Sequence, residues 1–185
     1  MNAVETILAE INSLADQINQ SEIESMVSYL VSKKERAKIF FAGAGRSGCV
    51  VKAFTNRMMH LGFSCHLLGD ITVPPISEGD ILFLISGSGK TTSLVAYANK
   101  AIACKADVLT ITLNEEGSIA QMAKEKIVLP GNTRLLNHAN FTSIQPIGST
   151  FEQLAWLTCD ALIFSLRDTL HQTNEDLIAY HANLE

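Results

Sequence analysis

Four hydroxyl side chains gather within seven residues near the middle of the chain, beside two glycines and a lysine. The segment reads Ser86, Gly87, Ser88, Gly89, Lys90, Thr91 and Thr92. An apolar run precedes it and a helix is expected after it, so its backbone N–H groups would face a ligand at a helix N-terminus. Glycines let the backbone approach a ligand closely, and hydroxyls donate hydrogen bonds without fixed charge. We call residues 86–91 the serine–glycine loop and predict that it binds a phosphate ester, although such turns also cap helices without binding a ligand.

The end of the serine–glycine loop, Gly89-Lys90-Thr91, matches the end of a P-loop for nucleoside triphosphates. A P-loop also needs a glycine five residues before Gly89. Leu84 stands at that position, inside the apolar run. The sequence therefore argues against a nucleoside triphosphatase.

A second glycine motif, formed by Gly43, Gly45 and Gly48, has the G-x-G-x-x-G spacing of dinucleotide-binding proteins. Asp70 lies about where such proteins bind a ribose. Against this alternative, the chain has no room for a separate substrate domain, and a dinucleotide does not require the serine–glycine loop. We expect Gly43 and Gly45 to form a sharp turn, with Ser47 facing the ligand at a helix N-terminus.

Arg46 lies between this glycine turn and Ser47. Its guanidinium could contact a substrate oxygen or pair with an acidic residue of a neighbouring subunit. The sequence leaves both roles open.

Strands and helices alternate around these loops, which predicts a three-layer α/β/α sandwich with a five-stranded parallel sheet in the flavodoxin-like order 2-1-3-4-5. Apolar runs predict strands at 38–42, 64–68, 80–85, 107–113 and 126–129. Helical spacing predicts helices at 46–61, 90–103, 118–123 and 149–170, preceded by one long N-terminal helix or two joined ones. Ligands bind such sheets at the carboxyl ends of the strands, where both glycine motifs stand.

We expect one domain over residues 1–185. Its parts are an N-terminal helical segment (1–36), a βα core (37–130), a loop (131–145) and C-terminal helices (146–185). The loop is polar and irregular, which makes it a candidate cover for the substrate. The tail at 174–185 is expected to contain a short helix.

The composition narrows the classes of partner. With 47% hydrophobic and 18% charged residues, we expect apolar surface to be buried in a homo-oligomer. The net charge of −5 and the lack of a Lys/Arg-rich stripe argue against nucleic acid. Neither a signal-peptide pattern nor an apolar stretch of membrane-spanning length is found, so we expect a cytoplasmic protein. Cys49, Cys65, Cys104 and Cys159 stand singly, and we expect buried, reduced thiols rather than a metal site.

Several segments together resemble the 6-phospho-3-hexuloisomerase family of SIS-domain sugar-phosphate isomerases. These are residues 41–48, 57–63, 86–91, 145–153 and 181–185. The glycine and serine motifs indicate only the SIS superfamily. The Phe151-Glu152-Gln153 segment and the final His181-Ala182-Asn183-Leu184-Glu185 narrow the resemblance, which runs from about residue 5 to the end.

The resemblance implies the SIS fold, a homotetramer, no metal or other cofactor, and a sugar phosphate as the small-molecule substrate. The implied reaction converts D-arabino-3-hexulose 6-phosphate into fructose 6-phosphate, in formaldehyde fixation through ribulose monophosphate or in its reverse. The implied substrate-binding residues are Ser47 and the serine–glycine loop, and Glu152 is the implied catalytic base. Relatives often carry glutamate where this chain has Lys90, which leaves the role of that side chain open.

Glu152 also has a purely structural interpretation. Ser149 and Glu152 have the S-x-x-E spacing of a capping box, in which the glutamate only accepts a hydrogen bond from the Ser149 N–H. A catalytic carboxylate would instead take a proton from C2 of the 3-ketose and return it at C3. The sequence allows both.

Histidines are the remaining candidates for acid–base work. Fructose 6-phosphate cyclises, so the reverse reaction needs the open chain, and His181 is our candidate for protonating a substrate oxygen, possibly in a neighbouring subunit's site. A solvated tail is the alternative. His60 is expected at an interface or in the core, and His138 on the covering loop. We expect His66 and His171 to be structural.

Two further functions remain as alternatives. Another sugar-phosphate isomerase, such as an arabinose 5-phosphate isomerase, often carries extra regulatory domains that do not fit within this length. A non-catalytic sugar-phosphate sensor usually carries a basic DNA-binding helix-turn-helix. The first 36 residues contain only Lys33, Lys34 and Arg36 as basic residues.

Overall fold

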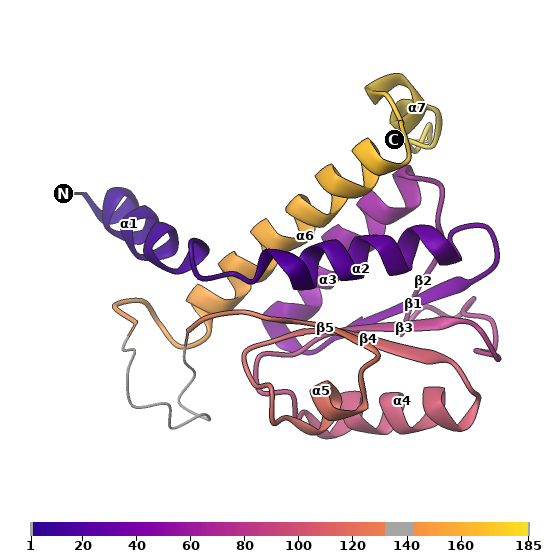
Figure 1. Cartoon of the computed structure of the whole chain (residues 1–185), viewed down its shortest axis with the longest axis horizontal. Coiled ribbons are helices and arrows are strands. Elements are labelled where there is room, and N and C mark those ends of the chain that lie inside the picture. Colours follow the sequence, from indigo (N-terminus) through magenta and orange to yellow (C-terminus); the bar gives the residue numbers. More distant parts are fainter. Residues whose placement is uncertain (1, 132–142, 185) are drawn as a thin grey trace.

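The computed structural model describes residues 2–131 and 143–184. Its five parallel strands follow the order β2-β1-β3-β4-β5, with helices on both faces, so the predicted α/β/α sandwich is confirmed (Figure 1). In chain order the elements are α1 (Ala3–Ala15), α2 (Gln20–Lys33), β1 (Lys38–Gly43), α3 (Gly45–His60), β2 (Ser64–Leu67), β3 (Ile81–Ile85), α4 (Thr92–Ala103), β4 (Asp107–Thr112), α5 (Ser118–Met122), β5 (Glu125–Val128), α6 (Ser149–Thr169) and α7 (Asn174–Ala179).

The sheet is covered unequally on its two faces. Helices α2, α3 and α6 pack on one face, and α4 with α5 on the other (Figure 1). Every residue of β3 is buried, because the central strand is covered on both sides, and this is why the strand is an unbroken apolar run. On the α3 face, the rings of Phe54 and Phe83 lie 5.1 Å apart and join the helix to the sheet.

The N-terminal segment forms two helices. Asn19 is the last residue of the segment that connects α1 to α2, and its side chain caps α2 by accepting a hydrogen bond from the Ser21 N–H. Helix α1 contacts α6 and extends beyond the sheet in Figure 1. Val4 and Leu8 of α1 remain exposed in the single chain.

Helix α6 has 21 residues and packs against α1, α2 and α3. One face is buried at helical spacing, including Phe151, Leu154 and Leu162. The opposite face exposes Trp156 and Phe164. None of the described helices is long and apolar enough to cross a membrane.

The carboxyl edge of the sheet brings the two glycine motifs together. Strands β1 and β3 are neighbours, with Gly43 opposite Ile85. Strand β1 leads into α3, and β3 leads into the serine–glycine loop. Both motifs therefore lie side by side, as the predicted strand order requires.

Candidate active site

The serine–glycine loop is held by hydrogen bonds to its carbonyl groups, one from within the loop and three from the residues between β4 and α5 and from α5. The pairs are Ser86 with the Gly89 N–H (3.1 Å), Gly87 with the Leu113 N–H (3.2 Å), Ser88 with the Asn114 side-chain amide (2.9 Å) and Gly89 with the Ile119 N–H (3.0 Å). In a planar trans peptide the N–H points opposite to the C=O. The Ser88 N–H therefore points away from the body, and neither it nor the Gly87 N–H donates a hydrogen bond to any of the described residues, an arrangement that suits an anion.

The hydroxyls of this loop contact one another and the loop backbone. Ser86 is buried, and its Oγ lies 3.4 Å from Oγ1 of Thr91. Ser88 Oγ accepts a hydrogen bond of 3.2 Å from the Lys90 N–H. Thr91 occupies the N-cap position of α4, but its side chain makes no cap hydrogen bond. The capping alternative therefore does not account for the Thr91 hydroxyl.

The glycine turn is explained by close packing of β1 against the first turn of α3. A Cβ at Gly43 would lie 2.9 Å from the Ser47 carbonyl oxygen, and one at Gly48 would lie 2.9 Å from the Gly43 carbonyl oxygen. Only glycine fits these contacts, with or without a dinucleotide. Gly45 begins α3 with a left-handed φ of 57°, and Ser47 is buried in that first turn.

Helix α6 adds a third segment to this edge. A Cβ at Gly87 would lie 3.1 Å from the ring of Phe151, so the first turn of α6 packs on the serine–glycine loop. Glu152 follows Phe151 in the same turn. Three stretches that are distant in the sequence, 45–48, 86–91 and 148–152, therefore meet at the carboxyl ends of the strands.

Glu152 pairs with Arg46 across the two helix N-termini. Arg46 Nε donates to Glu152 Oε2 at 2.7 Å, and the side chains are 67% and 14% exposed, respectively. The hydrogen bond to this carboxylate, followed by the carboxylate's charge, raises the pKa of Arg46. We expected Arg46 to contact a substrate oxygen or to pair with an acidic residue of a neighbouring subunit. In the structure it pairs with an acidic residue of its own chain.

The capping-box interpretation of Glu152 is wrong. The N-cap of α6 is Gly148, in a left-handed conformation with φ 83°, and the Ser149 N–H donates to the Pro146 carbonyl. Ser149 is thus already the first helical residue, one position too late to serve as the cap. The Glu152 carboxylate is bound by Arg46 instead.

Arg46 and Glu152 line a cavity of about 280 Å³. The other lining residues are Cys49, Val50, Gln153 and Trp156. Sequence reasoning missed Cys49 and Trp156 as site residues, and it predicted wrongly that Cys49 would be buried, because the residue is exposed. The signal was available: Cys49 follows Arg46 by three positions and Trp156 follows Glu152 by four, which places each pair on one helix face.

Gln153 fixes the chain that enters α6. The Gln145 side-chain amide donates to Gln153 Oε1 at 3.0 Å and to Glu10 Oε2 at 2.8 Å. Ser143 Oγ lies 2.7 Å from Thr150 Oγ1. Within the Phe-Glu-Gln segment, Gln153 therefore has a structural role in holding residue 145 against the start of α6. The expected covering loop lies mostly at 132–142, outside the described residues, as does His138.

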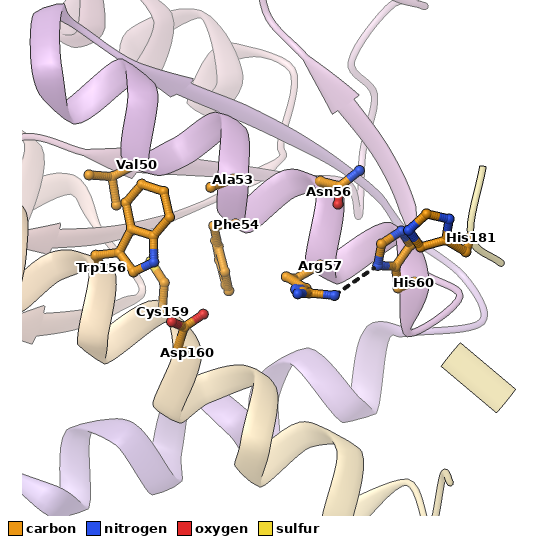
Figure 2. A pocket seen from close by; sticks show the side chains of 10 residues that line it. All are labelled: Val50, Ala53, Phe54, Asn56, Arg57, His60, Trp156, Cys159, Asp160 and His181. Atoms are coloured by element: carbon orange, nitrogen blue, oxygen red, sulfur yellow. Dashed lines mark hydrogen bonds between the residues drawn. The ribbon is translucent and has the colours of Figure 1, made fainter. Parts of the chain in front are cut away.

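His181 lies at the far end of α3, against His60. The two rings stack with centroids 5.1 Å apart, and Arg57 Nη1 is 3.5 Å from His60 Nδ1 (Figure 2). With Asp160 and others they line a second cavity of about 320 Å³ between α3 and α6. His60 lies about 20 Å along α3 from Arg46, given the rise of a helix. A catalytic role for His181 therefore needs the site of a neighbouring subunit.

The other predicted residues take structural positions or stay untested. His66 packs on Phe40 with ring centroids 5.3 Å apart, and burial, followed by the charge of Lys38, lowers its pKa. Lys90 is exposed at the rim of the serine–glycine loop. Within residues 2–131 and 143–184, no group of three or more His, Cys, Asp or Glu side chains is placed to hold a metal ion.

Comparison with known proteins places this geometry in context. Residues 32–157 match the SIS domain. The 3-hexulose-6-phosphate isomerase of Bacillus subtilis is 39% identical over 182 residues, covering 98% of this chain and 97% of that protein. The enzyme of the same name from Mycobacterium gastri is 33% identical over 184 residues, covering 100% and 90%. A crystal structure from Methanococcus jannaschii, for which the same function was inferred, has a TM-score of 0.76 at 29% identity and covers 90% and 87% of the two chains.

Proposed function

The chain belongs to the SIS-domain family, and on that premise we propose that it is a 3-hexulose-6-phosphate isomerase. It interconverts D-arabino-3-hexulose 6-phosphate and fructose 6-phosphate, a step of formaldehyde fixation through ribulose monophosphate or of its reverse. The observation that carries this proposal is the contact between Phe151 and Gly87, which brings the first turn of α6, where Glu152 also lies, against a loop suited to a phosphate. An anion site and a carboxylate at the same edge of the sheet are what a sugar-phosphate isomerase needs.

The phosphate binds at the serine–glycine loop. The N–H groups of Gly87 and Ser88, the N-terminus of α4 and the loop hydroxyls contact its oxygens. Lys90, exposed at the rim, adds attraction for the anion. The sugar carbons then extend toward Ser47 and the cavity lined by Glu152.

Glu152 transfers the proton between carbons. Its carboxylate removes the proton from C2 of the 3-ketose, and the electrons of the C–H bond form a 2,3-enediolate with negative charge on the C3 oxygen. The same proton returns to C3, the C2 hydroxyl loses its proton, and the C3 oxygen gains one. The products are a ketone at C2 and a hydroxyl at C3. Acid–base assistance of this kind contributes about 10²–10⁴-fold to a rate.

A homotetramer in the cytoplasm completes the proposal. Trp156, Leu157 and Phe164 on α6 are 45%, 51% and 60% exposed, and they form an apolar stripe that a second copy of the chain would bury. In such an assembly His181 of one subunit protonates a substrate oxygen in the site of another. His181 must serve another subunit's site because it lies against His60, about 20 Å along α3 from Arg46 of its own chain.

The proposal is tested by supplying enzymatically generated D-arabino-3-hexulose 6-phosphate and detecting fructose 6-phosphate. A second assay incubates fructose 6-phosphate in deuterated water and follows exchange at carbon-bound hydrogens, which reports enolisation directly. Arabinose 5-phosphate is the matched control substrate. Turnover of arabinose 5-phosphate alone would indicate the other isomerase class, and binding of sugar phosphate without exchange would indicate a sensor.

A further inference from the structure

We propose that Arg46 is a positioning residue that holds the Glu152 carboxylate in the orientation needed for proton transfer. This role deepens the proposed function and rests on Glu152 being the base. Arg46 is the second residue of α3, and Glu152 lies in the first turn of α6. Both side chains therefore start from helices that pack against one another, which favours a defined geometry.

The carboxylate is held through one of its oxygens, and the other lies beside a residue without a side chain. Arg46 Nε donates to Oε2 at 2.7 Å. A Cβ at Gly148 would lie only 3.0 Å from Oε1, so this oxygen uses space that any side chain at position 148 would take. The charged hydrogen bond from Arg46 restricts the rotation of the carboxylate. Restricting a base in this way removes much of the entropic cost of reaching the reactive geometry.

The two side chains differ in burial, which assigns them different roles. Glu152 is 14% exposed, whereas Arg46 is 67% exposed and covers the carboxylate from the solvent side. Arg46 carries a positive charge, as guanidinium groups do in proteins, and its hydrogen bond to Glu152 raises its pKa further. Cys49 is the other titratable group that lines this cavity among the described residues. Arg46 therefore supplies the positive charge that the ionised base faces.

A substrate-binding role for Arg46 predicts something different. Arg46 engages Glu152 through Nε only, and its terminal nitrogens make no hydrogen bond to any of the described residues. They could contact the substrate while Nε holds the base. The two roles separate because a substrate contact acts without Glu152, whereas a positioning contact acts only through it.

The test is a double-mutant cycle of Arg46→Gln and Glu152→Gln, measured by isomerisation and by deuterium exchange into fructose 6-phosphate. The positioning role predicts that Arg46→Gln lowers kcat about 10- to 100-fold in the wild-type background and less than about twofold in the Glu152→Gln background. Affinity for a hexitol 6-phosphate, which has no carbonyl and cannot enolise, stays within about threefold. Arg46→Lys, which keeps the charge, retains more activity than Arg46→Gln. Arg36→Gln, at an exposed arginine before β1, is the matched control.

The outcomes distinguish this inference from the proposed function. An inactive wild-type chain would overturn the proposed function, and a fully active Glu152→Gln variant would overturn the base on which the inference rests. If the wild-type chain is active and the Glu152→Gln variant is impaired, equal losses of kcat from Arg46→Gln in the two backgrounds would overturn the positioning role alone. A rise of tenfold or more in the hexitol 6-phosphate dissociation constant would instead assign Arg46 to substrate binding. Circular dichroism and Tm confirm that each variant is folded.

Discussion

Gly148 and Glu152 are coupled through space at the start of α6. Gly148 adopts a left-handed φ of 83°, and a methyl group on its Cα would lie 3.0 Å from Glu152 Oε1. Gly148, the N-cap of α6, thus also limits the space that the carboxylate can occupy. Any side chain at 148 must either move the carboxylate or move the first turn of α6.

Gly148→Ala is therefore expected to damage catalysis as well as stability. The left-handed backbone costs an alanine about 1–2 kcal/mol of folding stability. Displacement of Glu152 lowers kcat on the order of 10- to 100-fold. Gly79→Ala is a matched control, because Gly79 has a φ of 85° and nothing within 4 Å of its Cβ position. Equal kcat values in the two variants would show that Gly148 does not position Glu152.

Glu152→Gln keeps the size of the side chain but removes its ability to accept a proton from carbon. We expect kcat to fall at least about 100-fold with little change in Tm, because the proposed mechanism makes this carboxylate the base and the structure does not use it as a helix cap. Glu24→Gln, at an exposed position of α2, should leave both values unchanged. Wild-type exchange in Glu152→Gln would remove Glu152 from the mechanism and direct attention to His181 and His138.

Ser88→Ala and Thr91→Val each remove a hydroxyl from the serine–glycine loop. A hydrogen bond to a charged phosphate is worth about 1.5–3 kcal/mol, so we expect KM to rise about tenfold or more while kcat changes less. Initial-rate kinetics with the sugar phosphate measure both. Ser28→Ala on the exposed face of α2 serves as the control. A KM within twofold of wild type in both variants would contradict the phosphate assignment.

Asp80 makes folding stability sensitive to acid. Burial alone would raise the pKa of this carboxyl, but hydrogen bonds from the Lys38 N–H and from Ser77 outweigh it, so the pKa lies below its ordinary value. The stabilisation is complete above the unfolded pKa of about 3.9 and is lost as pH falls through the lower folded pKa. The free energy of unfolding should therefore decrease below about pH 4, and less steeply in Asp80→Asn.

The control for this pH dependence is Asp70→Asn, at an exposed position after β2. Urea unfolding at several pH values gives the free energy directly. At neutral pH, Asp80→Asn should cost about 1–3 kcal/mol, because buried donors lose a charged acceptor. Parallel pH curves for wild type and Asp80→Asn would show that other carboxylates govern acid unfolding.

Phe164→Glu tests the proposed homotetramer. A glutamate on the exposed stripe of α6 would carry a charge into a subunit interface, so we expect a smaller assembly in sedimentation equilibrium. Loss of activity should accompany dissociation if His181 serves a neighbouring site. Ile71→Glu, at a fully exposed residue away from α6, is the control. A Phe164→Glu chain with wild-type mass would place the interface elsewhere.

The layers and strand order could be predicted because buried parallel strands are read directly from apolar runs. Boundaries were harder where local conformation departs from the pattern. Helix α4 was expected from residue 90 but begins at Thr92, since Thr91 keeps a non-helical ψ of 118°. The same cause defeated the capping-box pattern, because the left-handed Gly148 moves the cap of α6 one residue earlier.

The pairing of Arg46 with Glu152 could not be predicted from local sequence. The two residues are 106 positions apart, and their contact depends on how α6 packs against α3. Both had been singled out for chemistry separately, from the glycine turn and from the Phe-Glu-Gln segment. Helical periodicity is sufficient to place Cys49 beside Arg46 and Trp156 beside Glu152, because each pair lies on one helix. It cannot relate residues of α3 to residues of α6.

In the proposed mechanism, recognition and chemistry are carried by separate pieces of chain. The serine–glycine loop is held through its carbonyl groups by Leu113, Asn114 and α5, whereas the carboxylate comes from α6. Either piece can therefore change while the other stays intact. On this proposal, a substitution at Glu152 leaves a protein that still binds sugar phosphates but no longer converts them, so an enzyme and a metabolite receptor built on this scaffold differ by as little as one side chain.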